Sequence, residues 1–545
     1  MPNNKLTTLL VFTLTTIFYI FTLLPSLAWG DGTKLQSEAI SGESFVLAEM
    51  TPEEFSPDPF IFSKIGVAAW DHPLYIILGH LLVQAFPLVD PLWLVNLISA
   101  LFGAASVALV FQLCCRFTES IPASCYAAFA LAVSHTFWWH SSTPEVYTLF
   151  VFLLLASVYL FDYYERTGKN SFLLGSAFSL GLAASDHLLA FLVIPALSLY
   201  YLLSRGYRSF HISQLRRLIF PSLGFLSGFI LYIIQFARMA GNFPLNEIMG
   251  PVIGSTFLSQ LVMLTPALLG EGVLNYLFLL TLQFSPIGVI LGVLGIRNIF
   301  GNRDLYLRKI LALFIVFTVF GILYRVSDQF AFFITSYVFW AMMMGIGVNY
   351  IFSKFSRKIR LVFAFILALM ILGAPFFYKA LPGLAEKASM NDASIGIPQI
   401  GIGVRDGLTY YINPNKREDY SAYDFGNQTS TNLAPKSVII AEWYTDTDEY
   451  FILRYFTKVK KVRSDVTVVG WPTHDPFSFN SQLALDLIED SFPKFPIYLA
   501  SLSNRFYAAS KLIEMYCIVP ENSLYRLYQR ANNDLHCLEN DSVTE

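Results

Sequence analysis

Carboxylates, imidazoles and a guanidinium recur in short polar strings that interrupt the long apolar segments of this sequence. The strings contain Asp31 (WGDG), Asp71 and His72 (WDHPLY), His140 and Glu145 (FWWHSSTPEVY), Asp186 and His187 (SDH), and Arg325 and Asp328 (YRVSDQF). A carboxylate can remove the proton of a hydroxyl. Arg and His can hold a phosphate through charge-assisted hydrogen bonds. Around one cavity, these side chains would suit acid–base chemistry on a hydroxyl beside a phosphate.

The composition places most of the chain in a membrane. Of the 545 residues, 55% are hydrophobic and 14% are charged, whereas soluble domains carry about 25% charged residues. A bilayer core needs roughly 20 apolar residues per helix. The sequence therefore predicts an α-helical polytopic membrane protein with about eleven transmembrane helices, at 7–28, 91–113, 121–139, 145–161, 171–185, 188–204, 218–237, 274–296, 309–324, 329–352 and 361–379.

Two apolar segments near the start have alternatives. The run 7–28 is expected to be a retained helix, and the alternative is a signal peptide with Lys5 before its apolar stretch and a cleavage site near Ala28. Residues 73–88 are apolar but short, which favours an amphipathic helix at the interface. A twelfth span there is the alternative, but it would reverse every later loop.

Two of the predicted spans, 171–185 and 188–204, are short and are separated by Ser185, Asp186 and His187. Three polar residues would be costly at the middle of a membrane. We therefore expect a tight helical hairpin whose tip reaches the membrane face.

The distribution of Lys and Arg in short loops predicts the orientation. With the N-terminus in the cytoplasm, the cytoplasmic loops hold fifteen Lys and Arg residues, and the opposite loops before residue 380 hold four, Lys34, Lys64, Arg238 and Arg325. An odd number of spans then places the C-terminal part outside the cytoplasm. All of the polar strings fall at this same outer face.

Two domains are expected. Residues 1–379 form the membrane domain, with a long acidic first outer loop at 29–72. Residues 380–545 are more charged, and short β-rich runs alternate there with helical ones, which is typical of a small α/β domain with a parallel sheet. The β-rich runs are 437–441, 466–470 and 496–500, and the helical runs are 446–457, 479–489 and 505–515.

Other motifs do not compete with this interpretation. The sequence has no Walker loop, no metal-binding cluster of Cys and His, and no dinucleotide fingerprint. The acidic string at 442–450 lacks the glycine and terminal glutamate of a calcium loop and is interpreted as a helix start. Cys517 and Cys537 form either one disulfide, if that part is outside the cytoplasm, or two unpaired buried thiols.

Each polar residue also has a purely structural interpretation. Asp31 and Asp186 could cap helices, His72 could simply start one, and Glu145 could favour a helix N-terminus. Arg325 and Asp328 could pair as a tether. Their shared membrane face favours a functional role, above all for Asp31. A transporter is the alternative class, but transporters place polar groups near the midplane, often in repeated halves, and no repeat is apparent.

Several strings resemble, in order, the landmarks of the bacterial and eukaryotic protein O-mannosyltransferase-like family, whose animal member modifies plexin-type receptor ectodomains. They are WGDG, DHPLYIILG, VNLISALFGAASVALVF, FWWHSSTPEVYTL, GLAASDHLLAFLVIPA, YRVSDQFAFFITSYVFWAMMMGIG and KSVIIAEWYTDTDEY with its continuation. The resemblance covers about residues 25–475. It implies a GT-C glycosyltransferase fold and transfer of a sugar from a polyprenyl-phosphate donor to an extracytoplasmic acceptor, usually with inversion.

The resemblance also implies roles for single residues. The family's catalytic base is the carboxylate of the first outer loop, which corresponds to Asp31. Lys34 stands where the family has a glutamate, and Glu43 is the candidate second carboxylate. The residues expected to bind substrate or phosphate are His72, Glu145, Asp186, His187, Arg325 and Asp328.

We accordingly expect a metal-independent glycosyltransferase without a cofactor, located in a bacterial plasma membrane. Its expected partners are the polyprenyl-phosphate-sugar lipid, a secreted or surface protein acceptor and membrane lipids, with no nucleic acid. A lipid or cell-surface glycan as acceptor is the alternative within the same fold.

Overall fold

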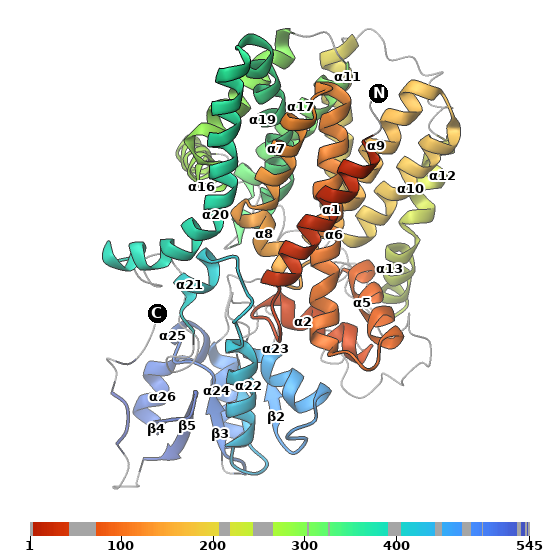
Figure 1. Cartoon of the computed structure of the whole chain (residues 1–545). Helices are drawn as coiled ribbons and strands as arrows, with labels where there is room; N and C mark the ends of the chain where they lie inside the picture. The colour runs from red at the N-terminus through yellow and green to blue at the C-terminus, as the bar shows by residue number, and fades with distance from the viewer. Residues whose placement is uncertain are drawn as a thin grey trace.

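The structure is a computed structural model, and the residues it describes are 4–42, 72–205, 219–242, 265–301, 305–324, 328–390, 405–441, 449–470, 481–492, 494–530, 536–539 and 542. It has a helical body and a smaller C-terminal domain with a sheet, which lies against one end of that body (Figure 1). The N-terminus lies at the opposite end of the body (Figure 1).

Each of the eleven predicted apolar runs contains a helix among its described residues, although the helix of the run 7–28 ends at Thr22. The helices are α1 (Lys5–Thr22), α6 (Pro91–Thr118), α7 (Ile121–Ala132) with α8 (His135–Ser142), α9 (Tyr147–Thr167), α10 (Asn170–Asp186), the short η1 (Leu188–Leu192) with α11 (Val193–Arg205), α12 (Ile219–Gly228) with α13 (Ile230–Asn242), α16 (Pro266–Gly301), α17 (Leu305–Leu323), α18 (Gln329–Phe332) with α19 (Ile334–Lys354), and α20 (Arg357–Lys387).

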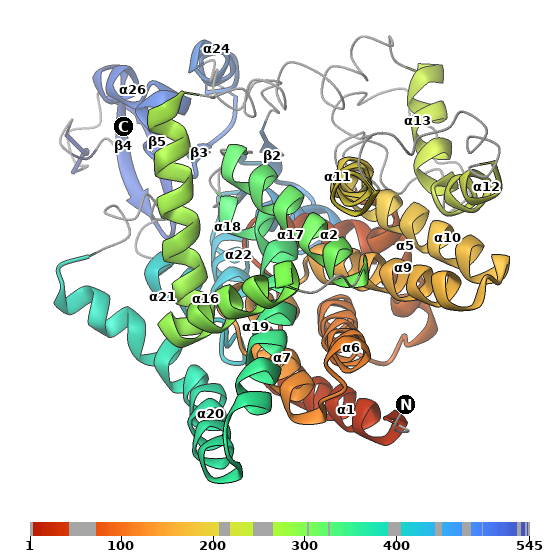
Figure 2. The same cartoon turned by 90° about the horizontal axis from the view of Figure 1, so that it is seen from above.

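Length and hydropathy confirm a multi-pass membrane protein. Within the described part of the chain, six helices are long and apolar enough to cross a membrane, namely α1, α6, α9, α16, α19 and α20. The pair α12–α13, bent by 63°, would make a seventh. Seen from above, α20 and α12 lie at outer edges of the body, while α6, α7 and α19 lie between them (Figure 2).

The inner helices approach closely because glycines face their neighbours. A Cβ at Gly347 of α19 would overlap the Leu291 carbonyl, and a Cβ at Gly295 of α16 would overlap the Met343 carbonyl. Helices in membranes use small residues at such crossings to bring their backbones together. This contact fixes α19, whose residues Ile334 to Val348 are all buried, in the middle of the body.

The first outer loop contains a helix that the sequence did not predict, α2 (Asp31–Ser41). Gln36 anchors it, because its side-chain amide donates to the Ser26 carbonyl (3.0 Å) and to Asn96 Oδ1 (2.8 Å) and accepts from the Ala28 N–H (3.0 Å). Leu35 and Ala39, one helical turn apart, also bury the helix in the hydrophobic core. α5 (Pro73–Ala85), the predicted interfacial helix, packs against α2 at the same end of the body (Figure 1).

The break between α10 and α11 lies where it was predicted. The prediction of a tight helical hairpin and the interpretation of Asp186 as a helix cap were wrong. α10 packs against α9 and α12, whereas α11 packs against α17, so the two helices diverge. Asp186 is the last residue of α10 and does not cap the η1 turn. His187 caps that turn instead, because its Nδ1 accepts a hydrogen bond from the Leu189 N–H (3.1 Å).

The C-terminal domain contains a five-stranded sheet in the order β2-β1-β3-β5-β4. The strands β1 (Val438–Ile440), β2 (Thr467–Val469) and β3 (Ile497–Leu499) are parallel, as predicted. The antiparallel hairpin of β4 (Tyr516–Glu521) and β5 (Leu524–Gln529) was missed. The helices of the C-terminal domain are α21 (Gly407–Ile412), α22 (Ser421–Thr431), α23 (Glu449–Arg454), the π-helix η5 (Tyr455–Val459), α24 (Ser481–Ser491), α25 (Asn504–Tyr507) and α26 (Ala509–Met515).

A disulfide joins Cys517 of β4 to Cys537, which confirms the first of the two alternatives for these cysteines. Most of the acidic string at 442–450 lies outside the described residues, and α23 begins at Glu449.

The helical body and the segment 405–421 meet along a contact that we call the seam. Here the Trp139 indole donates to the Tyr410 carbonyl (3.3 Å), and His135 Nε2 lies 2.8 Å from the Tyr411 carbonyl oxygen. The Lys416 N–H donates to the Thr22 carbonyl (3.0 Å). These bonds tie the segment to the ends of α1 and α8, which flank the polar residues of the first outer loop.

Candidate active site

Asp31 is placed at this end of the body by the turn between α1 and α2. It is the first residue of α2, after Gly30, whose φ of 67° is favourable for glycine. The side chain of Asp31 is exposed. A carboxylate in this position is open to an approaching substrate.

Glu145 lies just before α9 and is held by its backbone. Ser99 of α6 donates to the Glu145 carbonyl (3.0 Å) and accepts from the Glu145 N–H (3.0 Å). The Tyr75 hydroxyl of α5 in turn lies 3.0 Å from Ser99 Oγ. α5 and α6 therefore fix the backbone of Glu145, whose side chain is partly buried.

The electrostatics connect three of the predicted site residues. Burial raises the pKa of Glu145 well above its usual value, and the charges of Asp31 and Asp328 raise it further. The fold thus brings together carboxylates from α2, from the turn before α9 and from the start of α18. Their proximity favours a proton on Glu145 while Asp31 faces solvent.

Two imidazoles form the neighbouring part of the site. The ring centroids of His72 and His187 lie 5.2 Å apart, and His72 Nδ1 lies 2.5 Å from the Asp186 carbonyl oxygen. Tyr147 lies two residues after Glu145 in sequence and places its ring 5.4 Å from that of His187. Burial lowers the pKa of His187 well below its usual value, and His72 lowers it further. His187 is therefore neutral at physiological pH.

The Asp186 side chain is also buried at this position. Neither of its carboxylate oxygens has a hydrogen-bond partner among the described atoms, and the residue is 2% exposed. An isolated buried carboxylate is costly. Asp186 is thus adjacent to His72 through its backbone, while its side chain is available for a proton or a polar ligand.

Six predicted site residues are therefore described, and they lie at one end of the body: Asp31, His72, Glu145, Asp186, His187 and Asp328. Glu43 and Arg325 lie outside the described residues, as does Asp71. Asp328 is at the N-cap of α18 without a side-chain capping bond. In the described part of the chain, no three His, Cys, Asp or Glu residues form a group that could hold a metal ion.

His140 was named among the polar strings of the sequence but was given no binding role, and Tyr147 was not named as a site residue. Their rings lie 4.8 Å apart, beside His187 and Glu145. Both residues belong to the string FWWHSSTPEVY, which also holds Glu145, and that shared string was the signal that could have found them.

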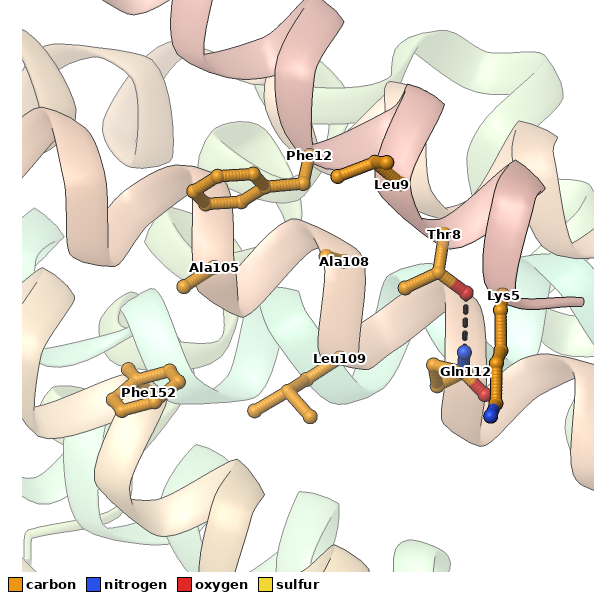
Figure 3. Close-up of a pocket in the computed structure, with 9 residues that line it drawn as sticks. All are labelled: Lys5, Thr8, Leu9, Phe12, Ala105, Ala108, Leu109, Gln112 and Phe152. Atoms are coloured by element: carbon orange, nitrogen blue, oxygen red, sulfur yellow. Dashed lines mark hydrogen bonds between the residues drawn. The ribbon is translucent and has the colours of Figure 1, made fainter.

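A cavity of about 420 Å³ lies elsewhere, between the first half of α1, α6 and α9 (Figure 3). Its lining is mostly apolar, and Gln112 donates to Thr8 across it (Figure 3). Lys5 lies at its rim, at the end of α1 that is remote from Asp31. This cavity is not part of the candidate active site.

The whole-chain fold matches that of solved membrane enzymes. ArnT from Cupriavidus metallidurans bound to undecaprenyl phosphate superposes with a TM-score of 0.60 and 12% sequence identity, covering 97% of this chain and 98% of that chain. The apo state of the same enzyme superposes with a TM-score of 0.57 and 13% sequence identity, covering 95% of this chain and 97% of that chain. The chain therefore shares the overall fold of ArnT.

Sequence comparisons match part of the chain to one protein family. Residues 71–209 match the family model of the protein O-mannosyl-transferase TMEM260 N-terminal domain. Protein O-mannosyl-transferase TMEM260 of Mus musculus is 30% identical over 178 residues, which cover 31% of this chain and about a quarter (25%) of the mouse protein. Both matches cover part of the chain, and over that part it resembles the TMEM260 family. The matched region contains His72, Glu145, Asp186 and His187.

Proposed function

We propose that this protein is a membrane glycosyltransferase that moves a mannose or another hexose from a polyprenyl-phosphate donor to Ser or Thr hydroxyls of extracytoplasmic proteins. The observation that carries this proposal is the grouping of an exposed carboxylate, Asp31, with the partly buried Glu145 and the His72–His187 pair at one end of the body. The match to an O-mannosyl-transferase family supports the reaction class. The bound undecaprenyl phosphate named for ArnT supports the donor class.

The reaction needs one base and a way to hold the leaving group. Asp31 takes the proton from the acceptor hydroxyl, whose oxygen attacks C1 of the sugar. The bond between C1 and the phosphate oxygen breaks, and polyprenyl phosphate leaves with inversion at C1. Arg325 holds the phosphate through charge-assisted hydrogen bonds, and His72 or the neutral His187 donates a ring N–H to it. None of these steps calls for a metal ion.

Two observations support an extracytoplasmic site. The disulfide between Cys517 and Cys537 belongs to an oxidising compartment. The C-terminal domain that contains it lies at the same end of the body as α2, whose first residue is Asp31 (Figure 1). The excess of Lys and Arg in the opposite loops agrees with this orientation.

Replacement of the proposed base tests the function. The Asp31→Asn variant should lose sugar transfer from a radiolabelled polyprenyl-phosphate donor by at least about 10²-fold, since general base catalysis contributes 10²–10⁴-fold. Asp90→Asn is the matched control: Asp90 caps α6 by accepting from the Trp93 N–H (3.0 Å), and asparagine caps equally well. Full activity of Asp31→Asn would remove Asp31 as the base.

The same variant identifies the acceptor. Surface proteins from cells that produce only Asp31→Asn should lack hexose on Ser and Thr peptides in mass spectrometry. Unchanged peptides together with an altered surface lipid or glycan would instead favour the alternative acceptor.

A further inference from the structure

His140 is a buried imidazole that neither the proposed base nor the proposed phosphate site uses. It lies on α8 and is 2% exposed. Neither Nδ1 nor Nε2 has a hydrogen-bond partner among the described atoms. Buried polar groups in native proteins are nearly always hydrogen-bonded, so an exception indicates a functional partner.

Aromatic rings surround this imidazole. The centroid of the Trp139 ring lies 5.0 Å away and that of Tyr147 4.8 Å away. The Phe330 ring stacks on the imidazole at 5.8 Å with an interplanar angle of 15°. These three rings come from α8, α9 and α18, and none of them offers a polar atom that bonds to His140. We call the four side chains the aromatic wall.

The aromatic wall is continuous with the candidate active site. Tyr147 contacts His140 on one side and His187 on the other. The charges of Asp31 and Asp328 both act on Tyr147. Tyr147 therefore connects His140 to the carboxylates and imidazoles of the candidate active site.

We propose that the aromatic wall is the sugar subsite, in which His140 hydrogen-bonds a hydroxyl of the donor's hexose while the rings of Tyr147, Trp139 and Phe330 pack against its C–H faces. This inference rests on the proposed function, because it assigns the sugar end of the proposed lipid donor to particular residues.

The protonation state of His140 favours a hydroxyl rather than a phosphate as its ligand. His140 is buried away from water and has no acidic hydrogen-bond partner among the described atoms, which favours the uncharged imidazole. The imidazole is therefore neutral at physiological pH, with one N–H donor and one acceptor nitrogen, which matches a hydroxyl that can both donate and accept. A neutral imidazole provides no charge for a phosphate.

Binding measurements on the detergent-solubilised full chain test the proposal. The probes are a short-chain prenyl phosphate and the same prenyl phosphate carrying mannose. The wild type should bind the mannosyl form more tightly than the bare form. His140→Phe should weaken binding of the mannosyl form about three- to ten-fold, the value of one neutral hydrogen bond, and leave binding of the bare form unchanged. His140→Asn, which keeps a donor and an acceptor, should restore part of the difference.

A matched control addresses folding. His80→Phe makes the same change at a buried imidazole on α5, whose Nδ1 lies 2.8 Å from the Ala39 carbonyl oxygen. It should lower thermal stability without changing the preference for the mannosyl probe. Thermal unfolding of each variant shows whether a loss of binding is a loss of folding.

The outcomes separate this inference from the proposed function. The sugar subsite is overturned if His140→Phe weakens binding of both probes equally or leaves binding of both unchanged. It is also overturned if the wild type shows no preference for the mannosyl form. These outcomes count against the subsite even where the wild type transfers sugar. If the wild type prefers the mannosyl probe through His140 but transfers no sugar to any hydroxyl, the transferase assignment fails instead.

Discussion

At the scale of single residues, the environment separates the roles of two carboxylates. Asp31 is exposed at the start of α2, whereas Glu145 is partly buried and is held between α5, α6 and α9. Burial and two neighbouring negative charges raise the pKa of Glu145. Enzymes commonly place such unequal pairs in one site so that one group accepts a proton while the other keeps one.

Glu145→Gln should make the protein more stable at neutral pH. Because the folded-state pKa of Glu145 lies above the unfolded value of about 4.3, the unfolded chain releases this proton first as pH rises. The wild type therefore loses stability relative to the variant as pH rises through the window above about 4.3. Thermal unfolding in detergent between about pH 4 and pH 8 measures this difference.

Glu514→Gln provides the comparison, since Glu514 is an exposed carboxyl of α26. Its stability should follow that of the wild type across the same pH range. A constant difference between wild type and Glu145→Gln would contradict the assigned shift.

At the scale of elements, the crossing of α10 and α12 determines where Asp186 and His187 lie. A Cβ at Gly181 would overlap the Phe225 carbonyl oxygen, and one at Gly228 would overlap the Phe178 carbonyl oxygen. Ser185 Oγ donates to the Gly228 carbonyl (3.0 Å) across the same crossing. The crossing thus fixes the end of α10, where Asp186 and His187 enter the site.

Gly181→Ala should destabilise the protein by about 1–3 kcal/mol, because the two backbones must separate to accept a methyl group. Gly175→Ala on the same helix is the control: its Cβ would meet only Leu160 Cδ1, at 3.4 Å. That control should be neutral or slightly stabilising, since alanine favours a helix over glycine. Equal unfolding temperatures of the two variants would show that the crossing is not tight.

At the scale of the whole molecule, the seam couples the helical body to the C-terminal domain. The Lys416 side chain is 2% exposed, and its ammonium donates to the Tyr410 carbonyl and lies 3.9 Å from the centroid of the Tyr410 ring. The Arg405 guanidinium lies over the rings of Trp29, at 5.4 Å, and Tyr411, at 5.2 Å. Two cations are therefore enclosed by aromatic rings beside the start of the first outer loop.

Comparison with Lys416→Met should show how the burial of Lys416 makes the free energy of unfolding of the wild type depend on pH. Burial lowers the pKa of Lys416 from 10.5 to about 8. Between about pH 8 and pH 10.5 the unfolded chain binds the proton that the folded chain has lost, so the stability of the wild type rises with pH. Relative to Lys416→Met, the free energy of unfolding of the wild type should increase by about 3 kcal/mol across that window, because each unit of pKa shift corresponds to about 1.36 kcal/mol.

Chemical denaturation of both proteins at several pH values measures this gain. The methionine variant loses the bond to the Tyr410 carbonyl at every pH, so only the change with pH reports the titration. A difference that stays constant between about pH 7.5 and pH 10 would show that Lys416 titrates normally.

Local patterns in the sequence determined the membrane helices and the parallel strands. All eleven apolar runs contain a helix, and β1, β2 and β3 lie within the three predicted β-rich runs, because run length, hydropathy and β-branched residues act within one element. The grouping of Asp31, Glu145 and the two histidines at one end also followed from counting spans. The hairpin of β4 and β5 was missed because no element was predicted after the helical run 505–515.

Only the tertiary structure decided how those residues differ from one another. α2 exists because Gln36 bonds to Ser26 and Asn96, and no local pattern encodes such a contact. The exposure of Asp31, the burial of Glu145 and the enclosure of His140 by rings from three helices depend on which elements pack together. Burial and distance are properties of long-range contacts, and they decide the protonation and the partners of each side chain.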